Sequence, residues 1–223
     1  MRNVALASLL ATALSLGALT ATQVGALSTA QLQALSHTEV SALDATQAAA
    51  LTTTQVKALS TTQFGALNAT DMGELTTTQI AAFTNTQAQS LTSTQLGGLA
   101  DTQIQALTTT QLSSLSTTQV RNLTTDILTA LTSTQMGALT SAQAQALETT
   151  DLAVLTTTQL RGLGSTQLAA LTTTQIGALT TTQVEGLSTA QVAGLTSAQV
   201  AALSTTQVGA LTSTQVGALG SAQ

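Results

Sequence analysis

The chain has 223 residues, of which 43% are hydrophobic and only 6% are charged, and its formal net charge is −5. It contains no cysteine, which excludes a disulfide framework and a thiolate metal site. Two phenylalanines, no tryptophan or tyrosine, and four lysines and arginines argue against nucleic-acid binding, which needs a basic surface and stacking rings.

Residues 1–18 lie outside the pattern that governs the rest of the chain. Arg2 is followed by an apolar run from Val4 to about Leu16 and then by small residues. This order favours a short secretory signal peptide. The alternative is a helical cap that shields the end of a repeat array, and both interpretations stay open. The run is too short, and too often interrupted by serine and threonine, to indicate a transmembrane span.

Residues 19–223 repeat one eight-residue unit, Leu-[Ser/Thr]-[Thr/Ser]-[Thr/Ala]-Gln-[Val/Ile/Leu]-x-[Ala/Gly]. Leu19 opens the first copy and Leu219 opens the last, incomplete one, so that (219 − 19)/8 = 25 complete copies come before it. The register never slips, and Phe83 is the only residue other than leucine at the first position. A period this short and strict predicts a solenoid in which each copy packs on its neighbours.

Positions two and five of the unit together form a helix-start signal. Position two is serine or threonine in most copies, and its replacements are mostly N-cap residues such as Asp44 and Asn68. Position five is glutamine in most copies, with Glu39, Asp71 and Asp151 among its replacements. Ser/Thr-x-x-Gln/Glu is the capping box, and the flanking leucine and aliphatic residue add a hydrophobic staple. Each copy is therefore expected to start a helix.

The eight-residue period distinguishes between three possible structures: a continuous helix, a β-solenoid and a solenoid of short helices. A continuous helix would turn by about 800° per copy, a drift of about 80°, so the leucine rows would spiral around it and bury nothing. A β-solenoid would use the threonine and valine residues as a strand, but positions one and six have opposite parity in a period-two pattern. We therefore predict an all-α fold: a repeat solenoid of very short N-capped helices, one per copy, over residues 19–223. The β-solenoid is the alternative.

Positions three and seven are predicted to face solvent, because they accept charged and polar residues. These residues are His37, Lys57, Asn85, Asp101, Arg121, Arg161 and Glu185. His37 is the only histidine of the chain. We interpret it as a tolerated surface substitution and not as a metal ligand or a general base.

Two irregular copies are candidate sites. In copy 123–130, Asp126 and Ile127 replace threonine and glutamine, which we interpret as decay of the repeat. Glu148 and Asp151 are three residues apart and could face each other as a weak cation site, but no further acidic ligand is close in the sequence. One histidine and scattered cations do not supply the base that a nucleophilic hydroxyl needs. We predict no catalytic, cofactor-binding or metal-binding residue, no cofactor, and no enzyme activity.

The octapeptide of residues 19–223 resembles the Leu-Thr-Thr-Gln-Val arrays of large bacterial secreted or surface proteins, which often carry labels such as heme utilization or adhesion exoprotein. The resemblance implies an extracellular or cell-surface location and an adhesin-like, structural role. It does not extend to haem binding here. Haem iron needs an axial ligand such as histidine, cysteine, methionine or tyrosine, and the chain offers His37 and three methionines.

The function expected from these features is a structural spacer or stalk. The alternative is a surface of threonine and glutamine ladders that binds an extended ligand such as ice or a polysaccharide, or that joins chains into fibres. Self-association through repeat faces and a cell-surface or polysaccharide partner both fit a neutral, hydroxyl-rich surface. The fold separates the two functions, because a β-solenoid would present a flat threonine face better than short helices would.

Overall fold

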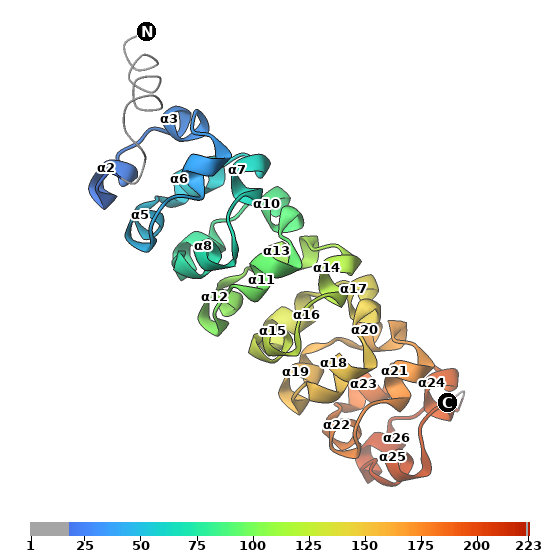
Figure 1. Ribbon diagram of the computed structural model, residues 1–223. Helices are drawn as coiled ribbons and strands as arrows, with labels where there is room; N and C mark the ends of the chain where they lie inside the picture. The colour runs from blue at the N-terminus through green and yellow to red at the C-terminus, as the bar shows by residue number, and fades with distance from the viewer. Residues whose placement is uncertain (1–17, 222) are drawn as a thin grey trace. The chain divides into compact units, whose positions relative to one another are not determined.

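The computed structural model describes residues 18–221 and 223, and the chain divides into two compact units, Met1–Ser114 and Leu115–Gln223. The described residues contain α-helices and no strand, which confirms the predicted all-α repeat solenoid and shows that the β-solenoid alternative is wrong (Figure 1). The prediction of a signal peptide or cap falls, apart from Ala18, outside the described residues.

The described part of the chain forms one helix of four to six residues in each complete copy. The helices of the first unit are α2 Ala21–Gly25, α3 Thr29–Gln33, α4 His37–Val40, α5 Ala45–Ala50, α6 Thr53–Ala58, α7 Thr61–Gly65, α8 Ala69–Glu74, α9 Thr77–Ala81, α10 Asn85–Ser90, α11 Ser93–Gly97, α12 Asp101–Ala106 and α13 Thr109–Ser114. Those of the second unit are α14 Thr117–Arg121, α15 Thr125–Ala130, α16 Ser133–Ala138, α17 Ser141–Ala146, α18 Thr149–Val154, α19 Thr157–Gly162, α20 Ser165–Ala170, α21 Thr173–Gly177, α22 Thr181–Gly186, α23 Thr189–Ala193, α24 Ser197–Ala201, α25 Thr205–Gly209 and α26 Ser213–Gly217.

The helices begin where the capping box predicts. At the start of α6, the Thr52 side chain accepts the Gln55 main-chain N–H at 3.2 Å, and Gln55 Oε1 accepts the Thr52 main-chain N–H at 2.7 Å. Ala100 and Gly164 lack a capping side chain, yet the glutamine three residues later still accepts their main-chain N–H. The glutamine half of the box is therefore kept even where the hydroxyl half is lost.

The chain turns between helices without a left-handed residue. Leu59, which follows α6, has φ −58° and ψ 127°, and the next residue, Ser60, is extended at φ −63° and ψ 158°. Among the described residues no φ is positive, at glycine or elsewhere. Two extended residues at positions one and two are thus sufficient to break each helix and redirect the chain.

Helices three copies apart pack against each other within each unit. The pairs α2 with α5, α5 with α8, α16 with α19 and α19 with α22 follow this rule, and the same spacing holds for the other well-packed pairs (Figure 1). One turn of the superhelix therefore takes about three copies of the repeat, and each unit has three columns of stacked helices. The sequence pattern alone does not predict this number.

Leucine at position one and the aliphatic residue at position six form the core. Leu51 is 5% exposed and Val56 is 1% exposed, which places both residues of the predicted staple in the interior. Phe83, the single exception at position one, packs edge-on against Phe64 with the ring centroids 4.8 Å apart. Each such side chain contributes about 1.5–3 kcal/mol by burial, and this holds helices that would be unstable alone.

Some glycines mark where two turns approach closely. A Cβ added to Gly162 in α19 would lie 2.1 Å from the carbonyl oxygen of Ser133 in α16. Gly209 in α25 has no atom within 4 Å of the same position. The first glycine is therefore required by packing, and the second is not.

We expect Gly162→Ala to lower the free energy of unfolding by about 1–3 kcal/mol, because main-chain atoms must shift to make room. Gly209→Ala is the matched control and should raise it by up to about 1 kcal/mol, since alanine favours a helix over glycine. Denaturant unfolding followed by circular dichroism measures both. Equal effects of the two substitutions would contradict the packing argument.

Candidate functional site

The feature repeated most regularly in both units is a row of buried glutamines, which we call the glutamine ladder. Each rung is the position-five glutamine, whose Nε2 donates to main-chain carbonyl oxygens 28 and usually 30 or 31 residues earlier. The rungs include Gln47, Gln55, Gln63, Gln79, Gln87, Gln95, Gln103 and Gln111 in the first unit, and Gln143, Gln159, Gln167, Gln175, Gln183, Gln191, Gln199, Gln207, Gln215 and Gln223 in the second.

One rung shows the geometry. Gln79 is 2% exposed, and its Nε2 lies 2.7 Å from both the Ala48 and the Leu51 carbonyl oxygens. Its Oε1 accepts the main-chain N–H of Thr76 at 2.6 Å and the Thr76 hydroxyl at 3.0 Å. A primary amide has two N–H donors and one carbonyl acceptor, so every hydrogen-bonding group of the Gln79 side chain has a partner. It connects the start of its own helix to the end of a helix one turn earlier.

Sequence reasoning explained the glutamine only as half of a capping box and missed the donor half. A capping box accepts glutamate as well as glutamine, but a carboxylate cannot donate to a carbonyl. Only Glu39 is a glutamate at position five, and it lies in the first described turn. The strong preference for glutamine over glutamate was therefore the available signal.

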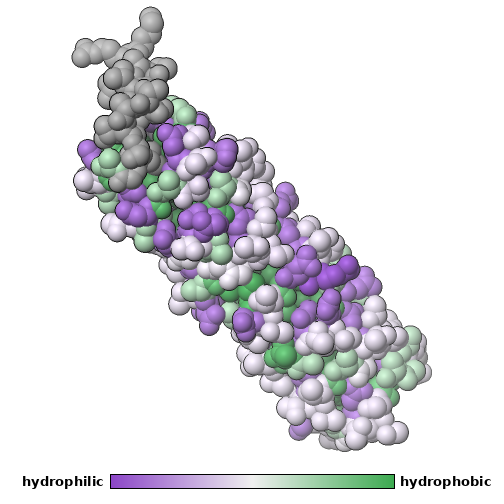
Figure 2. Space-filling view, in the orientation of Figure 1, coloured by the Kyte–Doolittle hydropathy of each residue, from purple (hydrophilic) through white to green (hydrophobic). Residues whose placement is uncertain are grey.

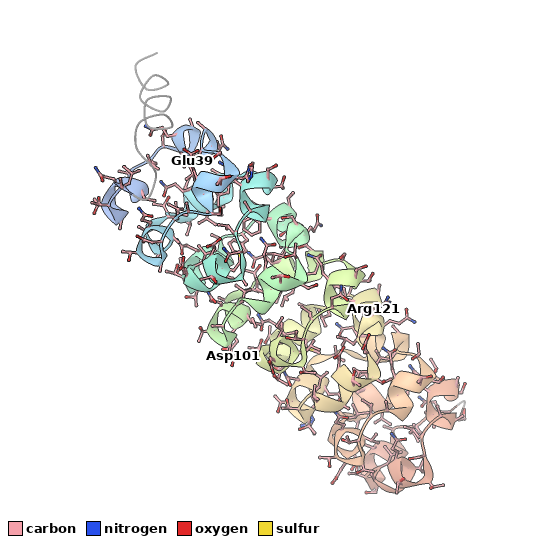
Figure 3. The ribbon with its side chains drawn as sticks, in the orientation of Figure 1. Glu39, Asp101 and Arg121 are labelled. Carbon is pink, nitrogen blue, oxygen red and sulfur yellow. The ribbon has the colours of Figure 1, made fainter. Side chains whose placement is uncertain are left out.

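The outer surface is formed by positions two, three, four and seven, as predicted for positions three and seven. His37, Lys57 and Glu185 are exposed, and Asp101 and Arg121 are exposed at the outer side of the ribbons of their units (Figure 3). In the face that Figure 2 shows, most of the surface has the white colour of weakly polar residues, with small purple and green areas. Threonine and serine hydroxyl groups therefore dominate what a partner would meet.

The two acidic residues considered above as a candidate pair, Glu148 and Asp151, do not face each other. Glu148 is exposed, whereas Asp151 is 6% exposed and its Oδ2 accepts the Glu148 main-chain N–H at 2.9 Å. Burial raises the pKa of Asp151, and the Glu148 charge raises it further, although the hydrogen bond from the Glu148 main chain lowers it. In copy 123–130, Asp126 is exposed and Ile127 is buried in place of a rung.

A second acidic group lies in the first unit. One carboxylate oxygen of Glu74, Oε2, is buried without a hydrogen-bond partner. Burial raises the pKa of Glu74, and the charges of Asp71 and Asp44 raise it further. Among the described residues no group of three or more acidic, histidine or cysteine side chains is arranged to hold a metal ion.

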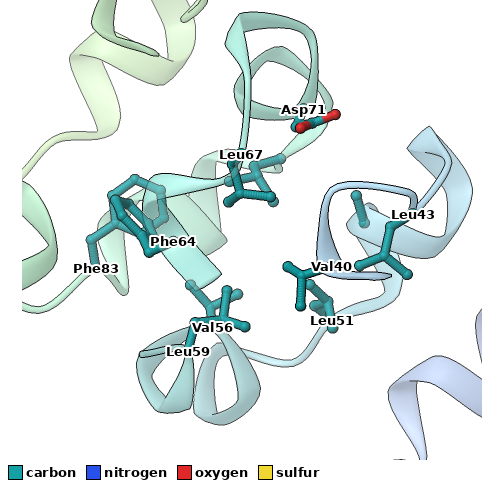
Figure 4. A pocket seen from close by; sticks show the side chains of 11 residues that line it. Val40, Leu43, Leu51, Val56, Leu59, Phe64, Leu67, Asp71 and Phe83 are labelled. Carbon is teal, nitrogen blue, oxygen red and sulfur yellow. The ribbon is translucent and has the colours of Figure 1, made fainter. Parts of the chain in front are cut away.

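The enclosed space next to these residues is apolar and small. Figure 4 shows Asp71 at its edge, with the carboxylate oxygens directed away from Phe64 and Phe83. The other lining side chains are Val40, Leu43, Ala48, Leu51, Val56, Leu59, Leu67 and Leu75. The volume of about 10 Å³ is close to the minimum for one water molecule, so it takes no organic ligand.

A more open feature lies on the second unit. A shallow groove of about 370 Å³ crosses α16 and α19, and its lining residues are Ser133, Thr134, Thr158, Arg161 and Gly162. The Arg161 Nε–H donates to the carbonyl oxygen of Gly186. The groove brings hydroxyl groups and one cation together, but no base lies among its lining residues, so it offers no nucleophilic machinery.

The fold and the ladder define the class of protein: an all-α solenoid of capped eight-residue repeats. The family model of the ALTTAQ repeat matches three stretches of this array, residues 104–141, 144–181 and 176–205, which together are less than half of the chain. The match supports a short tandem repeat array. No curated protein matches the chain. Within the described residues, no helix has the length and apolar character needed to cross a membrane.

We expect Gln79→Glu to lower the free energy of unfolding by about 2–4 kcal/mol at neutral pH, because two carbonyls lose their donor and an unpaired charge is buried. The matched control is Gln23→Glu. Gln23 is exposed, and its side-chain hydrogen bonds involve only Thr20, so a change within about 0.5 kcal/mol is expected. Chemical denaturation of both variants measures the difference, and equal losses would exclude a stabilising role of the Nε2 bonds.

Glu74→Gln should raise the melting temperature at pH 7, because it removes a charge that is half-buried and close to two other carboxylates. A pKa raised in the folded state means that the native chain gains stability as pH falls. The advantage of the variant is therefore expected to shrink as pH falls towards the ordinary glutamate value of about 4.3. Thermal unfolding of both proteins between pH 4 and pH 8 tests this. An advantage that stays constant with pH would contradict it.

Proposed function

We propose that the chain is a structural spacer, a stiff solenoid that sets a distance between whatever is attached to its two ends. On this proposal it acts as a stalk of an adhesin-like bacterial protein, outside the cell or on its surface, without catalysis. The resemblance of its octapeptide to the arrays of large bacterial secreted proteins supports the location and the adhesin-like role.

The observation that supports the spacer most is the glutamine ladder. Gln183 Nε2 lies 2.7 Å from the Leu152 carbonyl oxygen and 2.8 Å from that of Leu155, and the same pair of bonds recurs at one rung after another. Bending or stretching a unit would have to lengthen these buried bonds on several turns at once. A chain joined in this way keeps its spacing better than a flexible linker, whose length fluctuates.

The alternative function, a threonine face that binds a regular lattice or polysaccharide, receives less support. Successive helices belong to three different columns, so the hydroxyl groups of successive copies lie on different sides of a unit. Haem is also not favoured, because Met72 and Met136 are fully buried in the core and His37 is a single exposed residue.

The spacer function predicts a narrow distance between two labels that changes in equal steps. The chain contains no cysteine, so Arg121→Cys and Glu185→Cys, both at exposed positions of the second unit, accept spin labels cleanly. Pulsed electron resonance is expected to give one narrow distance. Each insertion of three copies, as a duplicate of 155–178, should lengthen it by a constant amount, because one whole turn is added.

The control is the same labelled protein in denaturant, where a broad distribution is expected. An insertion of a single copy should behave differently from one of three copies, since it moves the second label to another column. A broad distribution of the distance between the labels in native buffer would contradict the spacer proposal. So would a distance that grows only with the square root of the added length.

A further inference from the structure

Two positions of the glutamine ladder hold a buried aspartate, Asp71 in the first unit and Asp151 in the second. Asp151 leaves one main-chain carbonyl of the ladder without its donor. The position-five residues of the copies before and after Asp151 are normal rungs. Gln143 donates to the carbonyl oxygen of Leu115, and Gln159 donates to those of Leu128 and Leu131. The equivalent acceptors of position 151 are the carbonyl oxygens 28 and 31 residues earlier, those of Leu123 and Val120. An ionised aspartate has no donor for them.

The Leu123 carbonyl is left without a donor. Leu131 and Leu155 occupy the same position in later copies, and their carbonyl oxygens accept the amide N–H groups of Gln159 and Gln183 at 2.8 Å. No described residue donates to the Leu123 carbonyl oxygen. The buried Leu123 therefore lacks a donor to its carbonyl oxygen, and the buried Asp151 carboxylate, which accepts its hydrogen bond from the Glu148 main-chain N–H, has no proton to offer while it is ionised.

Among the described residues, no cation compensates the charge of the Asp151 carboxylate. Its own helix α18 carries no cation, α15 contributes only the exposed Asp126, α17 and α21 contain no titratable residue, and Arg121 at the end of α14 is exposed. Within the part of the chain that the structure describes, the Asp151 carboxylate accepts one hydrogen bond, from the Glu148 main-chain N–H. A buried charge without a partner is costly and is commonly neutralised.

We propose that Asp151 is a proton-binding rung: in mild acid its carboxyl group takes up one proton and donates the resulting O–H to the main-chain carbonyl of Leu123 or Val120. The proton comes from water, no other bond is broken, and one negative charge is removed from the interior. The second unit is then stabilised as the solution becomes more acidic, because a neutral donor completes the ladder. This goes beyond the spacer function and does not depend on it.

The direction in which stability changes with pH follows from the linkage between proton binding and folding. The ordinary aspartate pKa is about 3.9, and burial with the nearby Glu148 charge raises the pKa of Asp151 in the folded chain. The folded state therefore binds more protons than the unfolded state between these two values. Its contribution to stability is fully present below about pH 4 and is lost as pH rises through the folded-state value.

The test compares three variants of the full chain with the native sequence. Asp151→Gln restores an amide rung, Asp151→Asn removes only the charge, and Asp126→Asn removes an exposed charge of the same unit as a control. At pH 7 we expect Asp151→Gln to raise the folding equilibrium constant by on the order of tenfold, and this gain should disappear towards pH 4. Asp151→Asn should give a smaller gain, and Asp126→Asn should give almost none.

A direct readout keeps the proposal testable if a variant fails to fold. The side-chain carboxyl carbon of Asp151 in the native chain, titrated by nuclear magnetic resonance, should change its shift well above pH 4. Titration at or below the ordinary value would overturn the proposal. So would a gain of Asp151→Gln that is the same at pH 4 and pH 7, because that gain would then come from packing and not from the proton.

Discussion

The structure depends on one side chain that hydrogen-bonds to two helix ends at once. A helix as short as these has almost no interior, since its first four N–H groups and last four carbonyl groups lack intrahelical partners. The glutamine Oε1 meets a free N–H at the start of its own helix, and its Nε2 meets free carbonyls at the end of an earlier one. Gln79 does both, through Thr76 on one side and Ala48 and Leu51 on the other. Helices this short become stable because each supplies the cap of another.

Burial and the ladder have different roles. Leucine and aliphatic residues supply most of the free energy, but apolar contact is not directional, and near-identical copies would allow a slip by one whole repeat. The amide bonds have fixed reach and direction. The glutamine Nε2 groups donate to carbonyl oxygens 28 to 31 residues earlier, so they select the turn of about three copies from the alternatives that hydrophobic packing alone would allow.

Local features of the fold could be predicted from the sequence, and the long-range ones could not. Position two as N-cap, helices from position three, and the exposure of residues such as Lys57 all follow from rules that act over a few residues. The number of copies per turn is a property of contacts between copies that are three repeats apart, and identical copies carry almost no information about it. The structure shows one such contact at a pair of glycines in successive turns, where a Cβ on Gly137 would lie 2.7 Å from the Gly162 carbonyl oxygen. The prediction that the chain has no catalytic or metal-binding residue rested on residue types alone, whereas the burial of Asp151 could not be predicted without knowing the ladder.

The side-chain amides of the glutamine ladder explain why an array with so few charges can still adopt one defined structure. A solenoid joined by salt bridges would weaken with ionic strength, since charges are screened over about 8–10 Å in physiological salt. The rungs are neutral and buried, as for Gln183 at 3% exposure, so salt screens them little, and pH acts on the fold through carboxylates such as Glu74 and Asp151. The proposed spacer function requires this property, because the length of a spacer must be set by its own bonds and not by the medium. The same reasoning identifies the buried carboxylate of Asp151 in the ladder as one point where the pH of the medium does act on the fold.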